Sequence, residues 1–143
     1  MKCLCNAQAL IAAVILPLAL SSCVLSNSDP NFAALANTAE ANPSPTAIVG
    51  MWHRRDTRAM PGGSTMSFLF QSDGTMISQG RSKLAGADMG RTVETHRYYY
   101  AGGGIWLMAD DRGKFALSQG HLLFVYPIPE YYDEIRFVFD RKE

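Results

Sequence analysis

Cysteine is scarce in this chain, and the positions of the few cysteines exclude a fold held by disulfide bonds. All three, Cys3, Cys5 and Cys23, lie within the first 23 of 143 residues. Once residues 1–22 are removed as a signal peptide, as inferred below, Cys23 is the one cysteine of the mature chain. No disulfide within the mature chain can then form, so the burial of apolar surface must stabilise the fold.

An excess of charge of either sign is also lacking. Thirteen Lys and Arg residues balance thirteen Asp and Glu residues, which gives a formal net charge of zero at pH 7. Without residues 1–22, which contain Lys2, the balance is 12 basic against 13 acidic residues, a net charge of −1. This balance provides no strong attraction to nucleic acid, which is not expected as a partner. The length corresponds to one domain.

Motifs of common active sites are absent as well. The sequence contains no serine elbow, no paired catalytic carboxylates and no phosphate-binding glycine loop. Gly102–Gly104 precedes no helix and lacks the Lys-Ser/Thr pair that would hold phosphate, so it is interpreted as a turn. Asp110-Asp111 supplies too few carboxylates for calcium. We therefore expect a non-catalytic protein without a cofactor.

The three histidines, His53, His96 and His121, lack the spacing of metal ligands. We expect no metal site and interpret each histidine as an outward-facing or rim residue. His96 is the most interesting of them, because it shares a strand face with Tyr98 and Tyr100.

An apolar run near the N-terminus is too short to cross a membrane. Ala9–Leu20 has 12 residues and one interruption, at Pro17. A bilayer span needs about 20 residues, whereas a run of this length after Lys2 suits the core of a signal peptide. The run ends in Leu20-Ser21-Ser22-Cys23, which resembles the lipobox of bacterial lipoproteins. The resemblance implies cleavage of a signal peptide at 1–22 and lipidation of Cys23. The alternative is an ordinary signal peptide with an incidental cysteine.

Lipidation of Cys23 implies a location in the cell envelope, with the membrane as a partner. Each buried lipid methylene contributes about 0.8 kcal/mol, and two or three acyl chains together anchor a protein stably. The residue that follows is Val24 rather than aspartate. In a Gram-negative cell the family sorting rule then implies the outer membrane, facing the periplasm.

Residues 23–46 are predicted to be the lipidated cysteine and a flexible tether. The stretches 26–30 and 42–46 are polar and contain prolines, which disfavour helix. A segment of this composition is typical of a spacer that holds a domain off the membrane. The alternative is a short helix over Phe32–Glu40, with too little apolar area to dock firmly.

From Ala47 onward, short apolar segments alternate with turns, which predicts a β domain over residues 47–143. Met66, Phe68 and Phe70 alternate with neighbours of the opposite face, as in a half-buried strand. A long loop is expected at Gly80–Arg91. The expected strands are Ala47–Arg55, Ser64–Gln71, Thr75–Gln79, Thr92–Tyr100, Ile105–Ala109, Lys114–Ser118, His121–Tyr126 and Tyr131–Arg141.

No segment after Ala47 has an extended helical period, and tight turns join most of the expected strands. Consecutive hairpins give a meander, and a meander of eight strands can close on itself and remove its exposed edges. We therefore predict an all-β fold, a small antiparallel up-and-down barrel of about eight strands. A barrel of this size holds its own side chains or one small ligand.

Three features of the domain resemble those of small bacterial lipocalin-like, or calycin-type, barrels. They are Gly50-Met51-Trp52 on the first strand, the hairpin Phe68–Thr75 and Arg141 at the end of the last strand. The resemblance implies that Trp52 and Arg141 meet at one closed end, where a guanidinium over an indole contributes about 0.5–2 kcal/mol. Gly50, Trp52 and Arg141 are thus expected to form a structural latch. No room remains after Arg141 for the helix that follows a typical lipocalin barrel.

The favoured functional hypothesis is capture of a small apolar or amphipathic ligand inside the barrel, away from the latch. The expected ligand-binding residues are Phe68, Phe70, Trp106, Phe115, Leu117, Leu122, Phe124 and Phe137. The alternative is a protein-binding module, such as an inhibitor of an envelope or secreted hydrolase, which would act through the tether and the loops.

Two further groups of residues keep two interpretations each. Arg54, Arg55 and Arg58 are interpreted as a solvated basic loop, with contact to anionic lipid or a partner as the alternative. Tyrosines near the expected loops suit a recognition surface, but such rings also stabilise a sheet by cross-strand pairing. These tyrosines are Tyr98, Tyr99, Tyr100, Tyr126, Tyr131 and Tyr132.

Overall fold

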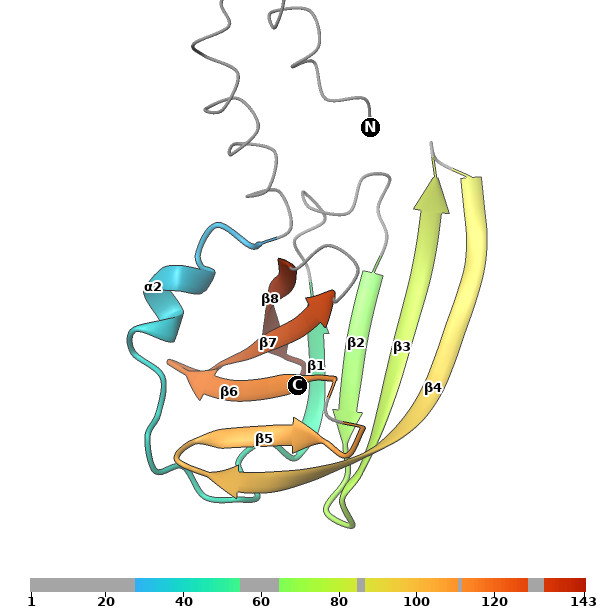
Figure 1. Ribbon diagram of the computed structural model, residues 1–143. Helices are drawn as coiled ribbons and strands as arrows, with labels where there is room; N and C mark the ends of the chain where they lie inside the picture. The colour runs from blue at the N-terminus through green and yellow to red at the C-terminus, as the bar shows by residue number, and fades with distance from the viewer. Residues whose placement is uncertain (1–27, 55–64, 85–86, 111, 129–132) are drawn as a thin grey trace, which may run out of the picture.

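The computed structural model describes residues 28–54, 65–84, 87–110, 112–128 and 133–143 (Figure 1). Several sequence-based predictions lie outside these ranges. They concern the signal peptide at 1–22, Cys23, the basic residues Arg55 and Arg58, and the tyrosines Tyr131 and Tyr132.

Eight antiparallel strands form one closed barrel in simple up-and-down order. Each strand pairs with the next along the chain, and the last pairs with the first through Trp52↔Arg141 and His53↔Asp140. The predicted fold class, a small antiparallel lipocalin-like barrel of eight strands, is therefore confirmed. The strands are β1 (Gly50–Arg54), β2 (Thr65–Phe70), β3 (Thr75–Leu84), β4 (Ala87–Gly102), β5 (Ile105–Met108), β6 (Lys114–Ser118), β7 (His121–Ile128) and β8 (Asp133–Arg141).

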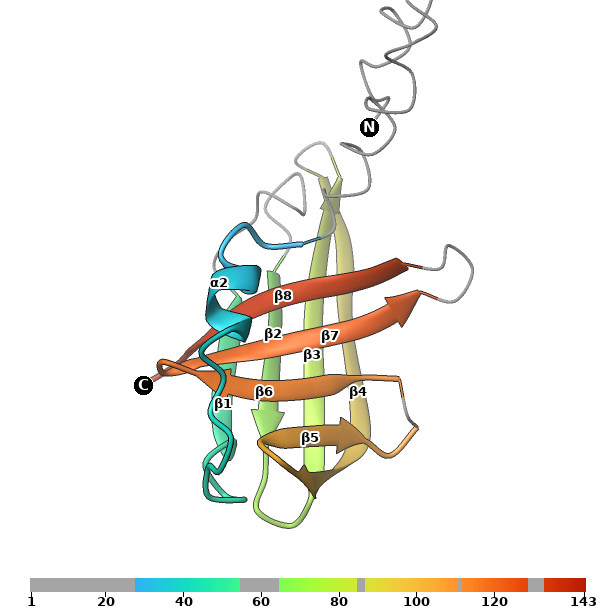
Figure 2. The same cartoon turned by 60° about the vertical axis from the view of Figure 1, so that its left-hand side comes forward.

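The turns between the strands define the two ends of the barrel. Gln71–Gly74, Gly102–Gly104 and Gln119–Gly120 lie where β1 begins and β8 finishes, and we call this the closed end. The strands β1, β3, β5 and β7 finish at the opposite end, which we call the open end (Figures 1 and 2).

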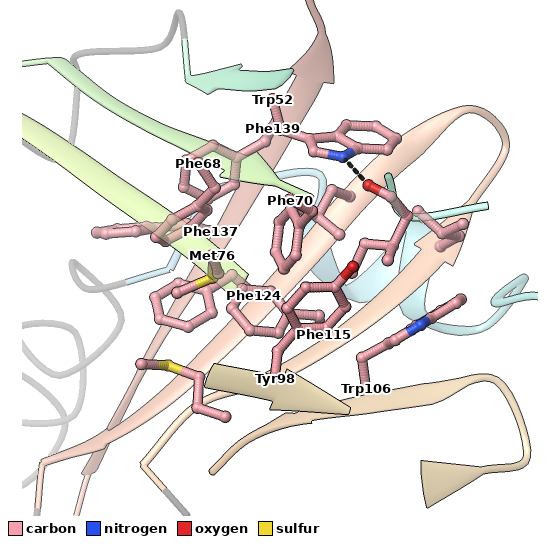
Figure 3. Packing of buried hydrophobic residues seen from close by; sticks show 14 residues of the cluster. Trp52, Phe68, Phe70, Met76, Tyr98, Trp106, Phe115, Phe124, Phe137 and Phe139 are labelled. Carbon is pink, nitrogen blue, oxygen red and sulfur yellow. Dashed lines mark hydrogen bonds between the residues drawn. The ribbon is translucent and has the colours of Figure 1, made fainter. Parts of the chain in front are cut away.

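Alternation of apolar residues along the strands puts aromatic rings inside the barrel, where they pack edge to face and in one stack (Figure 3). The rings of Phe115 and Phe124 stack with their centroids 4.9 Å apart. The ring centroids of Phe68 and Phe139 lie 4.8 Å apart. Burying each such side chain is worth about 1.5–3 kcal/mol. The core consists of Ile48, Trp52, Phe68, Phe70, Met76, Tyr98, Trp106, Met108, Phe115, Leu117, Leu122, Phe124, Phe137 and Phe139.

The predicted loop at Gly80–Arg91 is wrong, because β3 and β4 continue through it as a long hairpin. Arg81 pairs with Arg91, and a register shift follows at Ser82/Lys83. Gly90, at φ +107°, supplies the backbone conformation of a bulge, and Arg81 Nε donates to Asp88 Oδ2 at 2.9 Å. We call residues 81–84 and 87–93 the arm, because they project from the open end (Figures 1 and 2).

One side of β4 lacks a strand partner near the open end. β5 pairs only with Tyr98–Gly102 of β4, and the Arg97 carbonyl accepts from Ala109 N at 2.9 Å. Within the described ranges, Gly90–His96 pairs with β3 alone, and Met89 is the extra residue at the register shift. The barrel therefore opens sideways between β4 and the β5–β6 turn.

Residues 28–46 pack along the outside of the barrel, which contradicts the prediction of a flexible spacer over this range. They contain one short helix, α2 (Phe32–Ala36), within the range of the alternative helix. Phe32 is buried beside Leu123 and Val125 on the outer face of β7. The composition misled the prediction, because this face of β6 and β7 is apolar and needs a cover. We call residues 28–46 the strap.

Hydrogen bonds hold the strap along its length. Ser118 Oγ donates to the Leu35 carbonyl at 2.7 Å, and Glu40 N donates to the Leu117 carbonyl at 2.8 Å. On the neighbouring strand β5, Trp106 Nε1 donates to the Pro45 carbonyl at 3.1 Å. Two neighbouring strands, β5 and β6, therefore position this part of the strap.

Candidate ligand-binding site

The closed end is sealed by Trp52, Ile48 and Arg141. Trp52 is 1% exposed, and its Nε1 donates to the Ile48 carbonyl at 2.8 Å (dashed in Figure 3). The guanidinium carbon of Arg141 lies 4.5 Å from the Trp52 ring centroid. Arg141 also donates from Nη2 to the Ala47 carbonyl at 2.6 Å and from Nη1 to the Val49 carbonyl at 3.1 Å. Arg141 thereby joins the end of β8 to the chain that enters β1.

Gly50 makes room for this arrangement. Its φ is +130°, in a region that L side chains rarely adopt. A Cβ at this position would also lie 3.1 Å from Arg141 Nη1. The glycine of the Gly-x-Trp motif therefore allows the close approach of Arg141.

The seam between β1 and β8 is completed by a buried ion pair. Among the described residues, β1 pairs with β8 only near the closed end, and beyond that point Ser28 pairs with Arg136 in parallel. Asp29 Oδ1 accepts from Arg54 Nη2 at 2.5 Å, and Asp29 Oδ2 accepts from Arg54 Nε at 3.1 Å and from Val138 N at 2.7 Å. Asp29 thus accepts hydrogen bonds from Arg54 of β1 and from the Val138 amide of β8, where the two strands no longer pair.

Arg54 is therefore not a solvated loop residue. It is 2% exposed, and its guanidinium carbon lies 3.7 Å from the Phe137 ring centroid. Its Nη1 has no hydrogen-bond partner in the part of the chain that the structure describes. The sequence interpretation failed because nothing local indicated that Asp29, 25 positions earlier, would reach this arginine.

A cavity of about 290 Å³ occupies the open half of the barrel interior. This volume is close to the lower limit of about 300 Å³ for small-molecule sites. The residues that line it are Met66, Phe68, Met76, Ser78, Glu94, His96, Met108, Asp110, Arg112, Phe124, Tyr126, Ile135 and Phe137.

The structure divides the eight expected ligand-binding residues into two groups. Phe68, Phe124 and Phe137 line the cavity. The others lie in the packed core toward the closed end, where they contact one another and the latch, so they are core residues. These are Phe70, Trp106, Phe115, Leu117 and Leu122.

The cavity has an apolar floor and a polar side. Three methionines, Met66, Met76 and Met108, join the aromatic rings on the floor. The polar side is formed by β3, by β4 and by the β5–β6 turn, and the last two border the lateral opening of the barrel. It carries two carboxylates, one guanidinium, one imidazole and one hydroxyl: Glu94, Asp110, Arg112, His96 and Ser78.

His96 is the centre of a small polar cluster on this side. Its Nε2 lies 3.3 Å from Ser78 Oγ and 3.4 Å from Glu94 Oε2. These residue types occur in hydrolase triads, but there each ring nitrogen serves a different partner. Here both partners meet the same nitrogen, so the cluster is not arranged as a proton relay. It is arranged to present hydrogen-bonding groups to the cavity.

The sequence analysis did not predict most residues of the polar side. Some of these residues could have been found from the sequence, and others could not. Ser78 lies two residues after Met76 on the inward face of β3, so strand alternation extended from the hairpin would have found it. Asp110 and Arg112 belong to a turn. Nothing in a turn sequence indicates that it borders a gap in the barrel wall.

The tyrosines have separate structural roles. The Tyr98 hydroxyl donates to the Gln71 carbonyl at 2.6 Å, and burial, assisted by the charge of Asp73, raises the pKa of this phenol. The Tyr100 hydroxyl accepts from Gly104 N at 3.1 Å. Tyr126 lines the cavity, whereas Tyr99 is exposed. Tyr100 therefore pairs across strands with Trp106, whereas Tyr98 packs edge to face on Phe70 and bonds to the β2–β3 turn.

A larger hollow, of about 400 Å³, lies outside the barrel between α2 and β8. Its charged residues are already engaged, because His121 Nδ1 lies 2.9 Å from Asp140 Oδ1 and Asp29 is bound to Arg54. The hollow is the groove left where the strap rests on the barrel. The interior cavity is therefore the better candidate site despite its smaller volume.

Comparisons with protein-family models, with curated proteins and with solved structures find no match for this chain. The described helical segments include none that is long and apolar enough to cross a membrane. Within the same residues, no three His, Cys, Asp or Glu side chains are grouped closely enough to hold a metal ion. Function is therefore inferred from the geometry of the barrel.

Proposed function

We propose that this protein is an envelope lipoprotein, anchored through Cys23, whose barrel binds a small amphipathic ligand without catalysis. In a Gram-negative cell it would face the periplasm from the outer membrane. The observation that carries the proposal is the cavity of about 290 Å³ in the open half of the barrel. The packed closed half holds the barrel together while the open half is left for a ligand.

The lining favours a ligand with one apolar and one polar part. An alkyl chain against Met66, Met76 and Phe137 would exchange water for apolar contacts, at about 0.8 kcal/mol for each buried methylene. Methionine side chains are flexible and adapt to chains of irregular shape. A polar head group would remain beside His96 and Arg112, at the opening between β4 and the β5–β6 turn.

Mass spectrometry of lipophilic extracts from the purified protein tests the proposal. Ile135→Trp places an indole in the cavity, whereas Ile77→Trp makes the same change at a half-buried position outside its lining. A discrete species bound to wild type and to Ile77→Trp, and lost from Ile135→Trp, is expected. A cavity that yields no bound species and takes up no added alkyl amphiphile would refute the proposal.

The side of β4 that lacks a strand partner favours a second candidate, a protein-binding module such as a hydrolase inhibitor. A strand with free backbone groups can add an extended segment of another protein, and Gly90–His96 offers such groups within the described residues. An inhibitor acting through residues 28–46 is disfavoured, because these already bind the barrel. Pull-down of one envelope protein by wild type, and not by Val93→Lys, would support this candidate. Equal recovery by both would count against it.

A further inference from the structure

The first residues of the strap, Ser28 and Asp29, are held against the barrel. Ser28 pairs with Arg136 of β8, and Asp29 is held on both sides, by Arg54 and by the backbone of β8. Arg136 stands between Ile135 and Phe137, both of which line the cavity. The first described residue therefore lies beside the open half of the barrel, and buried bonds hold it there.

Chain length limits how far this point can lie from a lipid anchor. Four residues separate Ser28 from Cys23, and the five steps from one Cα to the next span about 17 Å when fully extended. The pairing of Ser28 with Arg136 is parallel, and β8 runs from the open end to the closed end. The chain therefore enters the strap in the direction that leads away from the open end.

If the closed end lay on the membrane, the segment between Cys23 and Ser28 would have to run the distance from Arg136 to the closed end. Arg141 lies five strand residues beyond Arg136, which is about 17 Å along β8. The chain would also have to reverse its direction before Ser28, and no length would remain for the reversal. With the open end on the membrane, only the three residues from Arg136 back to Asp133 separate Ser28 from the start of β8.

The arm projects from the same end and carries exposed apolar side chains. Met89 is 63% exposed and Val93 is 56% exposed. The exposed Arg91 lies between them, and its Nη2 donates to Gln79 Oε1 at 2.7 Å. Apolar side chains beside a cation suit the boundary between head groups and acyl chains. The neighbouring carboxylate of Asp88 is engaged by Arg81.

From these observations we propose that the open end faces the membrane and that the arm rests on the lipid surface through Met89 and Val93. This inference rests on the anchor at Cys23 in the proposed function. The half of the barrel that contains the cavity then faces the bilayer to which the protein is tied. Its ligand is therefore an amphiphile taken directly from that bilayer, such as a single-chain lipid.

Depth-dependent fluorescence quenching tests this orientation. The full lipoprotein is purified from membranes as Val93→Cys or as Ser72→Cys, which marks the exposed β2–β3 turn at the closed end. With Cys23 lipidated, the introduced cysteine is the one free thiol to label. Each protein is reconstituted in phosphatidylethanolamine and phosphatidylglycerol vesicles that contain brominated lipid. Quenching at 93 is expected to exceed quenching at 72 by about twofold or more, as for a residue at the interface.

Three results would overturn the proposal. Equal quenching at the two positions, or stronger quenching at 72, would show another orientation. Protection of position 93 together with a doubled molecular mass would show that a second copy covers the arm. An intact mass without lipid on Cys23 would remove the anchor and the orientation with it.

Ligand binding and membrane orientation are tested by separate measurements. Loss of the extracted species from Ile135→Trp would uphold the binding site even if the label at 93 stayed unquenched. Quenching at 93 without any bound species would uphold the orientation while binding failed. Arg91→Cys provides a second arm position if labelling of Val93→Cys disturbs the fold, which thermal unfolding would reveal.

Discussion

Arg141 acts at the closed end through three contacts made by one planar group. It covers the Trp52 ring and donates to two carbonyl groups ahead of β1. Lysine has the same charge but lacks the plane and the fork of donors needed to make all three contacts. Arg141→Lys and Arg141→Ala are therefore both expected to destabilise the barrel, by roughly 1–3 kcal/mol in urea unfolding. Full stability of Arg141→Lys would show that charge alone matters.

Trp52 is expected to contribute more than Arg141, because it is almost fully buried. Trp52→Ala removes a large core side chain and should cost about 3–5 kcal/mol. Thermal and urea unfolding measure the loss. Wild-type stability in this variant would mean that Trp52 does not support the core.

The Asp29–Arg54 pair predicts a non-additive result. Asp29→Ala leaves a buried guanidinium without its carboxylate, which typically costs about 3–5 kcal/mol. In Asp29→Ala/Arg54→Met no buried charge remains, so the double variant should be more stable than Asp29→Ala by at least about 1 kcal/mol. Urea unfolding of both variants and of Arg54→Met completes the cycle. Losses that simply add would show that the two residues act independently.

The sequence predicted the contact between the latch residues Trp52 and Arg141. It did not predict the ion pair between Asp29 and Arg54 at the seam between β1 and β8. Trp52 and Arg141 lie on strands whose alternation and order place them at one end. Arg54 follows Trp52 with the same parity, but a charged residue at a strand end suggests solvent. Only the position of Asp29 in the folded strap explains its burial.

Among the elements, the β2–β3 hairpin should respond to acid. Asp73 Oδ1 accepts from Thr75 N at 2.9 Å, and this bond lowers the pKa of Asp73 below its ordinary value of 3.8. The ionised carboxylate therefore favours the folded turn above pH 3.8, and this contribution is lost as pH falls through the lowered pKa. The NMR shift of the Thr75 amide should change in that acidic range and stay constant in Asp73→Asn. A change centred above pH 3.8 would contradict the assignment.

The strap should depend on the glycine turn between β4 and β5. A Cβ on Gly104 would collide with the Glu40 carbonyl oxygen, whereas one on Gly103 meets no atom within 4 Å. Both glycines have positive φ, so alanine costs about 1–2 kcal/mol at either position. Gly104→Ala should cost at least about 2 kcal/mol more than Gly103→Ala, because the strap must move.

Hydrogen exchange at Glu40, whose amide is bonded to Leu117, reports on that movement. Faster exchange is expected in Gly104→Ala and not in Gly103→Ala. Equal stability and equal exchange in the two variants would show that the strap contributes little to the fold.

Hairpin turns and strand alternation predicted the order of the elements because both are local properties. They did not predict the arm, since Gly80 and Gly90 resemble loop residues while one lies within a strand and the other within a bulge. They also did not predict the docked strap. Leu122 and Leu123 are adjacent and both buried, which is the sequence sign that β7 is covered on both faces.

The whole barrel is divided into two halves with different roles. The closed half is filled by aromatic rings and sealed by the latch, whereas the open half contains the cavity and a gap in its wall. The strap crosses the outside of the barrel and joins the halves. Under the proposed function, this division would let the open half exchange a ligand while the packed closed half maintains the fold.

NMR of protein labelled with ¹³C in the methionine methyl groups tests ligand binding most directly, with lauric acid as the added amphiphile. Met66, Met76 and Met108 line the cavity, whereas Met51 and Met89 lie outside its lining. The proposed site predicts saturable shifts of the three cavity methyl groups, with Met51 and Met89 unchanged, and loss of these shifts in Ile135→Trp. Shifts confined to Met51 or Met89, or no saturable shift at the cavity methyl groups, would contradict it.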